Sequence, residues 1–234
     1  MNILALDTAT EACSAALSIQ GRVLARFAIA GRSHTEQMIP MVQALMAEAG
    51  IGYSQLDGYV CGIGPGSFAG VRIGLGFMKG LALAADRPAV GISSLEALAW
   101  PALRDGAGRV LAAIDARMGE VYWAGYARTA EAQSLPVIAE QLRAPQQVPQ
   151  VDAGTWRAVG TGWGTYEGAL RQATGAVLSA MDGAALPHAE HALALGLPRL
   201  TAGQGCSLDQ LTPRYLRDKV ALTVLEQQAK RAGP

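Results

Sequence analysis

Three alternating glycines in the first half of the chain are the feature whose spacing could support chemistry. Gly62, Gly64 and Gly66 follow an apolar run at residues 59–63 that predicts a strand, and a helix is predicted to follow Ser67. Glycine permits positive φ and lets a ligand or another segment approach closely. Ser67 is a good N-cap, and the helix behind it directs free N–H groups and a partial positive charge toward the loop. The loop therefore predicts an anion site, with nucleotide phosphate as the first hypothesis and a tight turn packed against its own fold as the alternative.

Two common nucleotide motifs can be tested against this loop. The Walker motif needs a Gly-Lys-Ser/Thr ending, and the first lysine after the loop is Lys79. The spacing from Gly64 to Ala69 fits the loose dinucleotide pattern, but that pattern belongs in the first βα unit, and an acidic residue should close the next strand. Here about sixty residues come first, and the next predicted strand, residues 89–92, is followed by Ser93 and Ser94. A dinucleotide oxidoreductase is therefore disfavoured.

The elements that must position the loop begin at the N-terminus. Residues 2–6 form an apolar run that is short enough for a buried strand and that stops at Asp7. Residues 13–19 and 22–29 predict a hairpin, and a helix is expected from Ser33. Strand, acidic turn, hairpin, helix, strand, glycine turn and helix is the order of a ribonuclease-H-like lobe of the actin/sugar-kinase type. We therefore predict an α/β fold with two lobes, each a mixed sheet flanked by helices.

A boundary near residues 100–108, where Pro and Gly interrupt the pattern, divides the prediction into two lobes. We assign residues 1–102 to an N-terminal lobe and residues 103–217 to a C-terminal lobe, with a C-terminal helix at about 218–232 rejoining the first lobe. Within the second lobe the pattern predicts strands at 109–114, 120–126 and 157–159, helices at 165–173 and 188–195, and irregular structure with one short helix after Pro145 across residues 129–150.

Five separate motifs make the resemblance to a known family specific. They are Asp7-Thr8-Ala9-Thr10, Ser33-His34-Thr35-Glu36-Gln37-Met38-Ile39-Pro40, the run from Gly64-Pro65-Gly66-Ser67-Phe68 to Gly74, Asp115-Ala116-Arg117-Met118-Gly119-Glu120-Val121-Tyr122, and Pro213-Arg214-Tyr215-Leu216-Arg217. In this order the chain resembles the TsaB (YeaZ) family of bacterial tRNA threonylcarbamoyladenosine biosynthesis proteins, grouped with the glycoproteases. The resemblance covers nearly the whole chain and is strongest in the first 125 residues.

The resemblance implies a non-catalytic scaffold or activator subunit in the synthesis of N6-threonylcarbamoyladenosine at position 37 of tRNA. It implies a heterodimer with the catalytic relative TsaD, recruitment of the ATPase TsaE, a homodimer when TsaD is absent, and contact with tRNA only through the complex. The main alternative is an autonomous metal-dependent hydrolase or ATPase of the glycoprotease family.

The two helices predicted in the first lobe, one from Ser33 and one after Ser67, carry apolar residues on nearly all sides. A helix that covers one face of a sheet needs only a single apolar stripe. The functional interpretation is a subunit interface, for which methionine is well suited, and the alternative is a thick core in which the helices cover each other. The residues that we predict for docking are Met38, Met41, Val42, Leu45, Val71, Leu75 and Met78.

The absence of a histidine pair is the sequence argument against catalysis. The resemblance to TsaD implies a His-x-x-x-His metal pair after the strand that follows the glycine-loop helix, and two histidines four residues apart share one helix face. Ser94 and Leu98 occupy those positions here. We expect His34 to be an exposed residue at a helix start, and His188 and His191, without a nearby cysteine, to hold no metal. The prediction is no catalytic residue and no metal.

The sequence contains only part of a nucleotide site. The residues that keep it are Asp7, Gly64, Gly66, Ser67, Arg72 and Asp115. No adenosine clamp of the Gly-Gly-x-x-x-Asn type follows, and residues 160–163 are the nearest glycine cluster. We therefore predict a degenerate site, with weak ATP or ADP binding at most and no tightly bound cofactor. Because no Ser-His-Asp or Cys-His set can be argued from spacing, protease activity is disfavoured.

Composition is that of an ordinary cytoplasmic protein. The 234 residues are 50% hydrophobic and include 19 basic and 19 acidic residues, so the net charge is zero. A chain without basic excess is a poor candidate to bind tRNA unaided. Cys13, Cys61 and Cys206 lie far apart, which predicts reduced thiols. No apolar run approaches the roughly 18 residues that a membrane span requires, so we expect no membrane association.

Overall fold

The computed structural model describes residues 1–31, 33–82, 85–131 and 133–217. A mixed five-stranded sheet in the order β3-β2-β1-β4-β5 forms the first lobe. Its strands are β1 (Ile3–Asp7), β2 (Ala12–Ile19), β3 (Arg22–Ile29), β4 (Gly58–Gly62) and β5 (Ala89–Ile92). The first three strands pair antiparallel, and β1, β4 and β5 pair parallel. These are the strands that the apolar runs predict.

The second lobe repeats this strand plan. Its sheet has the order β10-β9-β6-β7-β8, with β6, β7 and β8 antiparallel and β6, β9 and β10 parallel. The strands are β6 (Arg109–Arg117), β7 (Glu120–Arg128), β8 (Ser134–Arg143), β9 (Thr155–Val159) and β10 (Val177–Asp182). Two mixed sheets of one topology, each with helices on its faces, confirm the predicted fold class.

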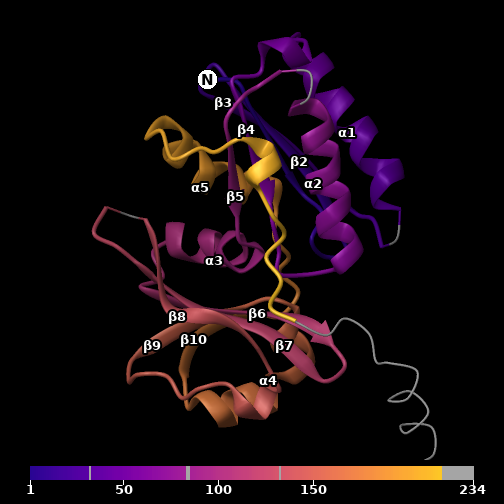
Figure 1. Ribbon diagram of the computed structural model, residues 1–234. Coiled ribbons are helices and arrows are strands. Elements are labelled where there is room, and N and C mark those ends of the chain that lie inside the picture. Colours follow the sequence, from indigo (N-terminus) through magenta and orange to yellow (C-terminus); the bar gives the residue numbers. More distant parts are fainter. Residues whose placement is uncertain (32, 83–84, 132, 218–234) are drawn as a thin grey trace, which may run out of the picture.

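Helices cover both faces of the first sheet (Figure 1). On one face lie α1 (His34–Ala49) and α2 (Phe68–Ala82), whose inner residues pack with those of β1 and β2. On the other face lies α5 (Ala189–Thr201), which contacts β1, β2, β4 and β5. Because both faces are covered, every residue of β1, β2 and β4 is buried, which explains why these strands read as continuous small and apolar runs.

Helix α3 (Ser94–Arg104) lies between the lobes and belongs to both cores. Leu95 and Leu98 pack with the second sheet, whereas Ala97 packs with α5 and the first sheet. Helix α4 (Thr161–Thr174) covers the outer face of the second sheet, where Trp163 packs among large apolar side chains. The second lobe therefore has a core on each face of its sheet, as the first lobe does.

The chain returns to the first lobe earlier than the predicted boundary at residue 217. Helix α5, which the sequence assigns to the second lobe, packs on the first sheet, and Leu208 and Leu211 join the core beneath α1 and α2. A bridge between Ala89 and Cys206 fixes this return beside β5. The boundary is displaced because the helical pattern of residues 188–195 gives no information on which sheet the helix covers. The predicted helix at 218–232 lies outside the described residues.

Two strands of the second sheet are missing from the sequence prediction. β8 occupies part of the stretch predicted as irregular, and β10 follows α4 without any predicted counterpart. Both are edge strands in which no residue is fully buried, so neither shows the alternation that marks a strand. The short helix predicted after Pro145 is present as a 3-10 turn, Pro145–Gln147. Within the described residues, no helix has the length and apolar character needed to cross a membrane.

Candidate functional site

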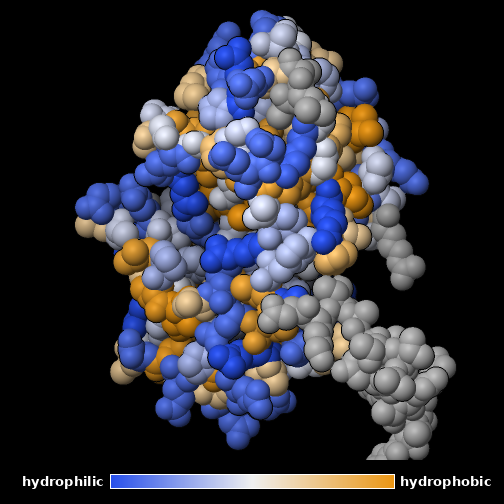
Figure 2. Space-filling model, in the orientation of Figure 1, coloured by the Kyte–Doolittle hydropathy of each residue, from blue (hydrophilic) through white to orange (hydrophobic). Residues whose placement is uncertain are grey.

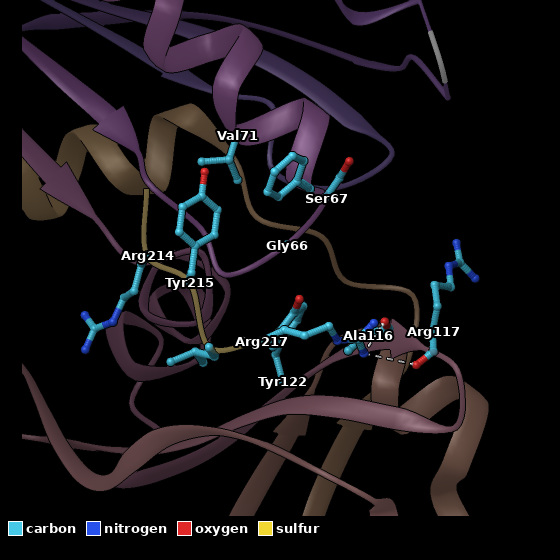
Figure 3. Close-up of a pocket in the computed structure, with 11 residues that line it drawn as sticks. Gly66, Ser67, Val71, Ala116, Arg117, Tyr122, Arg214, Tyr215 and Arg217 are labelled. Carbon is cyan, nitrogen blue, oxygen red and sulfur yellow. Dashed lines mark hydrogen bonds between the residues drawn. The ribbon is translucent and has the colours of Figure 1, made fainter. Parts of the chain in front are cut away.

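A cleft between the lobes meets the glycine loop. It contains a cavity of about 330 Å³ that is lined by the turn after β1, the start of α1, the glycine loop and the β6–β7 hairpin. An adjoining cavity of about 180 Å³ shares Gly66, Ser67, Ala116, Arg117 and Tyr122, and is closed by residues 214–217 near the end of the described chain (Figure 3). This cleft is where the predicted nucleotide site would lie.

The glycine loop lies against the turn that follows β1. The Ser67 amide donates to the Ala9 carbonyl at 2.6 Å, and a Cβ added at Gly66 would lie 2.1 Å from the same carbonyl oxygen. Thr8 packs equally closely, because its hydroxyl donates to the Gly70 carbonyl at 2.7 Å and its own carbonyl lies 2.1 Å from a Cβ at Gly70. Ser67 also caps α2 as predicted, accepting from the Gly70 amide at 3.2 Å. A carbonyl oxygen of the chain itself therefore occupies a position where the loop could have received an anion.

Asp7, the predicted phosphate-side carboxylate, is enclosed in the core. Its Oδ1 accepts from the Ala9 amide at 2.9 Å, and its Oδ2 is buried without a hydrogen-bond partner among the described residues. A Cβ at Gly62 would lie 2.2 Å from this Oδ2, so the glycine makes room for the carboxyl group. Burial raises the pKa of Asp7 to about 6. The described residues that line the cleft cavities do not include Asp7, so its position favours a structural role.

Asp115 and Arg72 lie near the cleft but contact their neighbours. Asp115 lines the larger cavity, where its Oδ2 pairs with the Arg117 guanidinium at 3.0 Å and its Oδ1 accepts from the Arg117 amide at 2.8 Å. Arg72 extends along α2, with its guanidinium carbon 3.2 Å from the centre of the Phe68 ring. The structure therefore brings Gly66, Ser67 and Asp115 to one cavity, while Asp7 and Arg72 lie outside its lining.

His34 is buried, contrary to the prediction that it is exposed at the helix start. Its side chain fits beneath the turn after β1, and Nε2 lies 2.7 Å from the Thr10 carbonyl. Ser33 makes no side-chain cap for α1, because its hydroxyl donates to the Ala30 carbonyl at 2.8 Å. Ser33 therefore does not cap α1, and α1 is anchored at its start by the histidine.

Buried residues occupy the two positions where the family resemblance implies a histidine pair. Ser93 caps α3 by accepting from the Leu95 amide at 3.2 Å, and Ser94 and Leu98 follow on the buried side of this helix. Leu98 packs in the core of the second lobe and has no ligating atom, and neither position carries an imidazole. His188 and His191 have ring centres 5.1 Å apart, and burial lowers the pKa of His191 to about 4. Across the described residues, no group of three or more His, Cys, Asp or Glu side chains could hold a metal ion.

Most of the predicted docking residues are core residues. Six of the seven have exposed fractions of 4% or less: Met38, Val42, Leu45, Val71, Leu75 and Met78. Met41 is partly buried against the same core. The prediction of these six side chains as a surface is therefore wrong, because five of them cover the first sheet and Val71 lines the smaller cleft cavity. The alternative, a core beneath the two helices, is correct for this face.

The outward face of α1 and α2 is a different set of residues. Ile39 is 39% exposed, and Ile73 and Phe77 are partly exposed. Gly76 and Gly80 of α2 have no heavy atom within 4 Å of an added Cβ. Figure 2 shows hydrophobic surface interspersed with hydrophilic surface over this part of the molecule. The apolar excess that predicted an interface is present, but on the opposite side of the helices.

Sequence reasoning assigned no role to the residues that close the cleft. Arg214, Tyr215 and Arg217 line the smaller cavity together with Tyr122 of β7 (Figure 3). The motif at 213–217 was part of the family resemblance, but a short segment outside any helix or strand has no periodicity from which contacts could be predicted. The signal was the density of arginine and tyrosine in five residues.

Comparison with known proteins gives matches over nearly the whole chain. The profile of the family described as "TsaD: tRNA N6-adenosine threonylcarbamoyltransferase" matches residues 28–222. The tRNA threonylcarbamoyladenosine biosynthesis protein TsaB of Escherichia coli is 44% identical over 226 residues, which cover 94% of this chain and 96% of the relative. The protein of the same name from Haemophilus influenzae is 38% identical, with 94% and 95% covered.

Solved structures agree with these sequence matches. The structure described as YeaZ from Pseudomonas aeruginosa is 42% identical, has a TM-score of 0.84, and is matched over 92% of this chain and 99% of its own length. A second structure, described as an uncharacterized protein with similarity to peptidase YEAZ from Pseudomonas aeruginosa, has a TM-score of 0.85 at the same identity and coverage.

Proposed function

Since the chain belongs to the TsaB (YeaZ) family of tRNA threonylcarbamoyladenosine biosynthesis proteins, we propose that it is the non-catalytic scaffold subunit of that synthesis. In this proposal it binds TsaD as a heterodimer, and the pair recruits TsaE. The observation that carries the proposal is the filled glycine loop, in which the Ala9 carbonyl accepts from the Ser67 amide. A loop that uses its donors for internal packing supports a retained scaffold better than a working phosphate site.

The catalytic alternative is an autonomous metal-dependent hydrolase or ATPase. One solved neighbour is described as similar to a peptidase, so this alternative needs an experimental test. Two further features favour the scaffold. Leu98, at the position of an implied metal ligand, is packed in the core, and the Asp7 carboxyl group is enclosed beside Gly62. Elemental analysis of the purified protein separates the two proposals, because about one tightly held transition metal per chain would support the alternative and contradict the scaffold.

The docking surface that we propose is the outward face of α1 and α2. It combines exposed apolar side chains, such as Ile39, with the open surface at Gly76 and Gly80. Small residues allow a partner helix to approach closely, and neighbouring apolar side chains supply buried area. In the absence of TsaD the same face would pair with a second copy of the chain, so self-association and TsaD binding would compete.

One substitution with a matched control tests this surface. Gly76→Arg places a long side chain in open space on the outer face of α2, and it should leave the fold intact because a helical glycine is replaced by a better helix former. We expect loss of co-elution with TsaD, loss of the homodimer and loss of threonylcarbamoyladenosine formation. Gly168→Arg makes the same change on the exposed face of α4, where a Cβ also has no neighbour within 4 Å, and should retain all three.

The outcomes distinguish the surface from the function. If Gly76→Arg still binds TsaD and supports product formation, the docking face lies elsewhere while the scaffold proposal stands. If the unmodified chain neither co-elutes with TsaD nor stimulates threonylcarbamoyladenosine formation, the scaffold proposal is wrong. Retention of TsaE by the TsaD pair, but by neither subunit alone, tests the recruitment step.

We also propose that tRNA binds only through the complex. The chain has 19 basic and 19 acidic residues, so it lacks the excess of positive charge on which non-specific tRNA affinity depends. A filter-binding titration should show negligible tRNA binding by the isolated chain and a gain only when TsaD is added. Salt-dependent binding by the isolated chain would contradict this part of the proposal.

A further inference from the structure

Strand β3 differs from the other three edge strands that the structure describes, because each of those is protected against pairing with a further strand. A bridge between Ala89 and Cys206 covers β5. Strand β8 contains Pro136 and pairs with β7 through two register shifts, and β10 has a shift between Leu178 and Ala180. Strand β3 contains no proline, pairs with β2 in one unbroken register, and has no buried residue. It is therefore an open edge.

The β2–β3 hairpin determines which backbone groups of β3 point away from β2. Its turn, residues 20–21, has positive φ at both positions, so the flanking residues Ile19 and Arg22 form a hydrogen-bonded pair. At the far end of the hairpin the Ala30 amide donates to the Glu11 carbonyl at 2.8 Å. Because hydrogen-bonded pairs alternate along an antiparallel ladder, the even-numbered residues of β3 bond to β2. The odd-numbered residues direct their N–H and C=O groups to the free edge: Val23, Ala25, Phe27 and Ile29.

The two faces of β3 differ in their chemistry. Three apolar side chains that are between 41% and 60% exposed share one face: Val23, Phe27 and Ile29. On the opposite face Arg26 pairs with Glu48 of α1. Arg22 lies on the same face as Arg26 by the alternation of the strand, and it forms no ion pair with the described residues. The open edge therefore has one apolar face and one face with an excess of positive charge.

We propose that the edge of β3 binds an extended segment of another protein, which adds a strand to the first sheet. The segment alternates apolar residues, which cover Val23 and Phe27, with acidic residues, which pair with Arg22 and complement the charge of its face. A second copy of the chain fits less well. Antiparallel pairing through all four edge residues would place Arg26 directly opposite its counterpart, and like charges in that position are destabilising. This surface is not the outward face of α1 and α2, and the inference does not depend on the proposed function.

The probe is a fluorescent peptide in which valine and glutamate alternate over the length of β3. It is titrated with the full chain, and fluorescence anisotropy measures its binding. We expect the parent protein to bind this peptide roughly tenfold more tightly than the same peptide with lysine in place of glutamate. N-methylation of the valines, whose N–H groups would face β3, should abolish binding. N-methylation of the glutamates, whose N–H groups would face solvent, should leave binding in place.

Two substitutions in β3 test the site on the protein. Ala25→Pro removes a donor from the free edge without removing a bond to β2, so the chain should fold and lose peptide binding. Ala25→Val keeps this N–H group and is the matched control, which should bind as the parent does. Arg22→Glu should reverse the preference, so that the lysine peptide binds more tightly than the glutamate peptide.

Several results would overturn the proposal. One is parent-like binding by folded Ala25→Pro, and others are equal affinity for the two peptides or no binding of the glutamate peptide by the parent. A dimer of the parent that Ala25→Pro dissociates in sedimentation would assign the edge to a second copy, which also contradicts the proposal. If circular dichroism shows that Ala25→Pro does not fold, the N-methylated peptides and Arg22→Glu decide the question.

Discussion

The two lobes share one strand plan, and the two aspartates predicted to hold a nucleotide lie on corresponding strands. Asp7 ends β1 in the first lobe, where its carboxyl group is buried and faces Gly62. Asp115 lies near the end of β6 in the second lobe, where it lines the cleft and pairs with Arg117. The same position in the fold thus gives an enclosed acid without an ion-pair partner among the described residues in one lobe and an acid paired with an exposed arginine at the cleft in the other. Strand position alone does not determine the chemistry of a carboxylate, because the residues packed over it decide its solvation.

The glycine turns, unlike the two aspartates, pack in the same way in both lobes. Gly66 lies against the Ala9 carbonyl after β1, and Gly160 lies against the Ala113 carbonyl of β6. A Cβ would approach these oxygens to 2.1 and 2.3 Å, and Gly160 also has a φ of +107°. In each lobe the turn before a helix is therefore packed on the lobe's own first strand or the turn that follows it.

The largest expected effect comes from breaking this shared packing. Gly66→Ala and Gly160→Ala should each lower the free energy of unfolding by about 3 kcal/mol or more, because backbone must move to relieve the contact. Urea denaturation followed by circular dichroism measures the loss. A loss below about 1 kcal/mol for Gly66→Ala would mean that the loop has room for a ligand after all.

The second-largest effect is the pH dependence of stability that Asp7 is expected to cause. The pKa of Asp7 is about 6 in the folded chain against an ordinary value of 3.8, so the folded state binds more protons between these values. Stability from this group is therefore greatest at low pH and is lost as pH rises through about 6, by an amount on the order of 3 kcal/mol. Measured against Asp7→Asn between pH 4 and 7.5, the parent protein should show this relative loss.

Asp7→Asn also tests whether the role of Asp7 is structural or catalytic. At pH 7.5 Asp7→Asn should still support threonylcarbamoyladenosine formation with TsaD and TsaE, because the carboxyl group lies outside the cavity lining. A folded variant that has lost this activity would restore Asp7 as a functional acid.

A smaller effect of opposite sign is expected on the helix surface. Gly76→Ala should stabilise the chain by about 0.5–1 kcal/mol, because alanine costs less backbone entropy in a helix and meets no neighbour within 4 Å. Gly168→Ala on α4 is the matched change in the second lobe and should behave alike. Thermal melts at concentrations where the chain is monomeric measure the gain, and a loss in Gly76→Ala alone at higher concentrations would support the proposed pairing of this face with a second copy.

The smallest effect is expected at the ion pair of Asp115 and Arg117. Asp115→Asn should change the free energy of unfolding by less than about 1 kcal/mol, since Arg117 is 76% exposed and solvent screens its charge, although the Asp115 side chain is only 10% exposed. Calorimetry should give ATP binding no tighter than roughly the high-micromolar range, on the order of 5 kcal/mol, with or without this substitution. Low-micromolar affinity that Asp115→Asn abolishes would show a working nucleotide site.

The sequence predicted the structure best where a pattern of residues has a single physical explanation. The buried strands β1 and β4 were predicted because both faces are covered, and the cap at Ser67 was predicted from local chemistry alone. The edge strands β8 and β10 were not, because their pairing partners rather than their own alternation hold them in place.

The docking face and His34 failed for related reasons. When a helix is apolar on nearly all sides, periodicity cannot say which side meets the sheet, so Leu45 and Met78 were assigned to a surface that they do not reach. His34 was interpreted as exposed because helix starts usually are, whereas the turn after β1 folds over it. Both errors concern packing between segments distant in sequence, which local patterns do not encode.

Four glycines at intervals of four, Gly62, Gly66, Gly70 and Gly74, meet the single turn formed by Asp7, Thr8 and Ala9. At each of them a Cβ would lie between 2.1 and 2.5 Å from an oxygen of that turn. Saturation mutagenesis of this stretch should therefore record intolerance with a four-residue period. In a genetic screen that profile would look like the signature of a phosphate-binding loop, although its cause is the thickness of one turn. Mutational intolerance in this lobe thus measures how closely the glycines pack on one turn, and it identifies a ligand only when a ligand has been seen to bind.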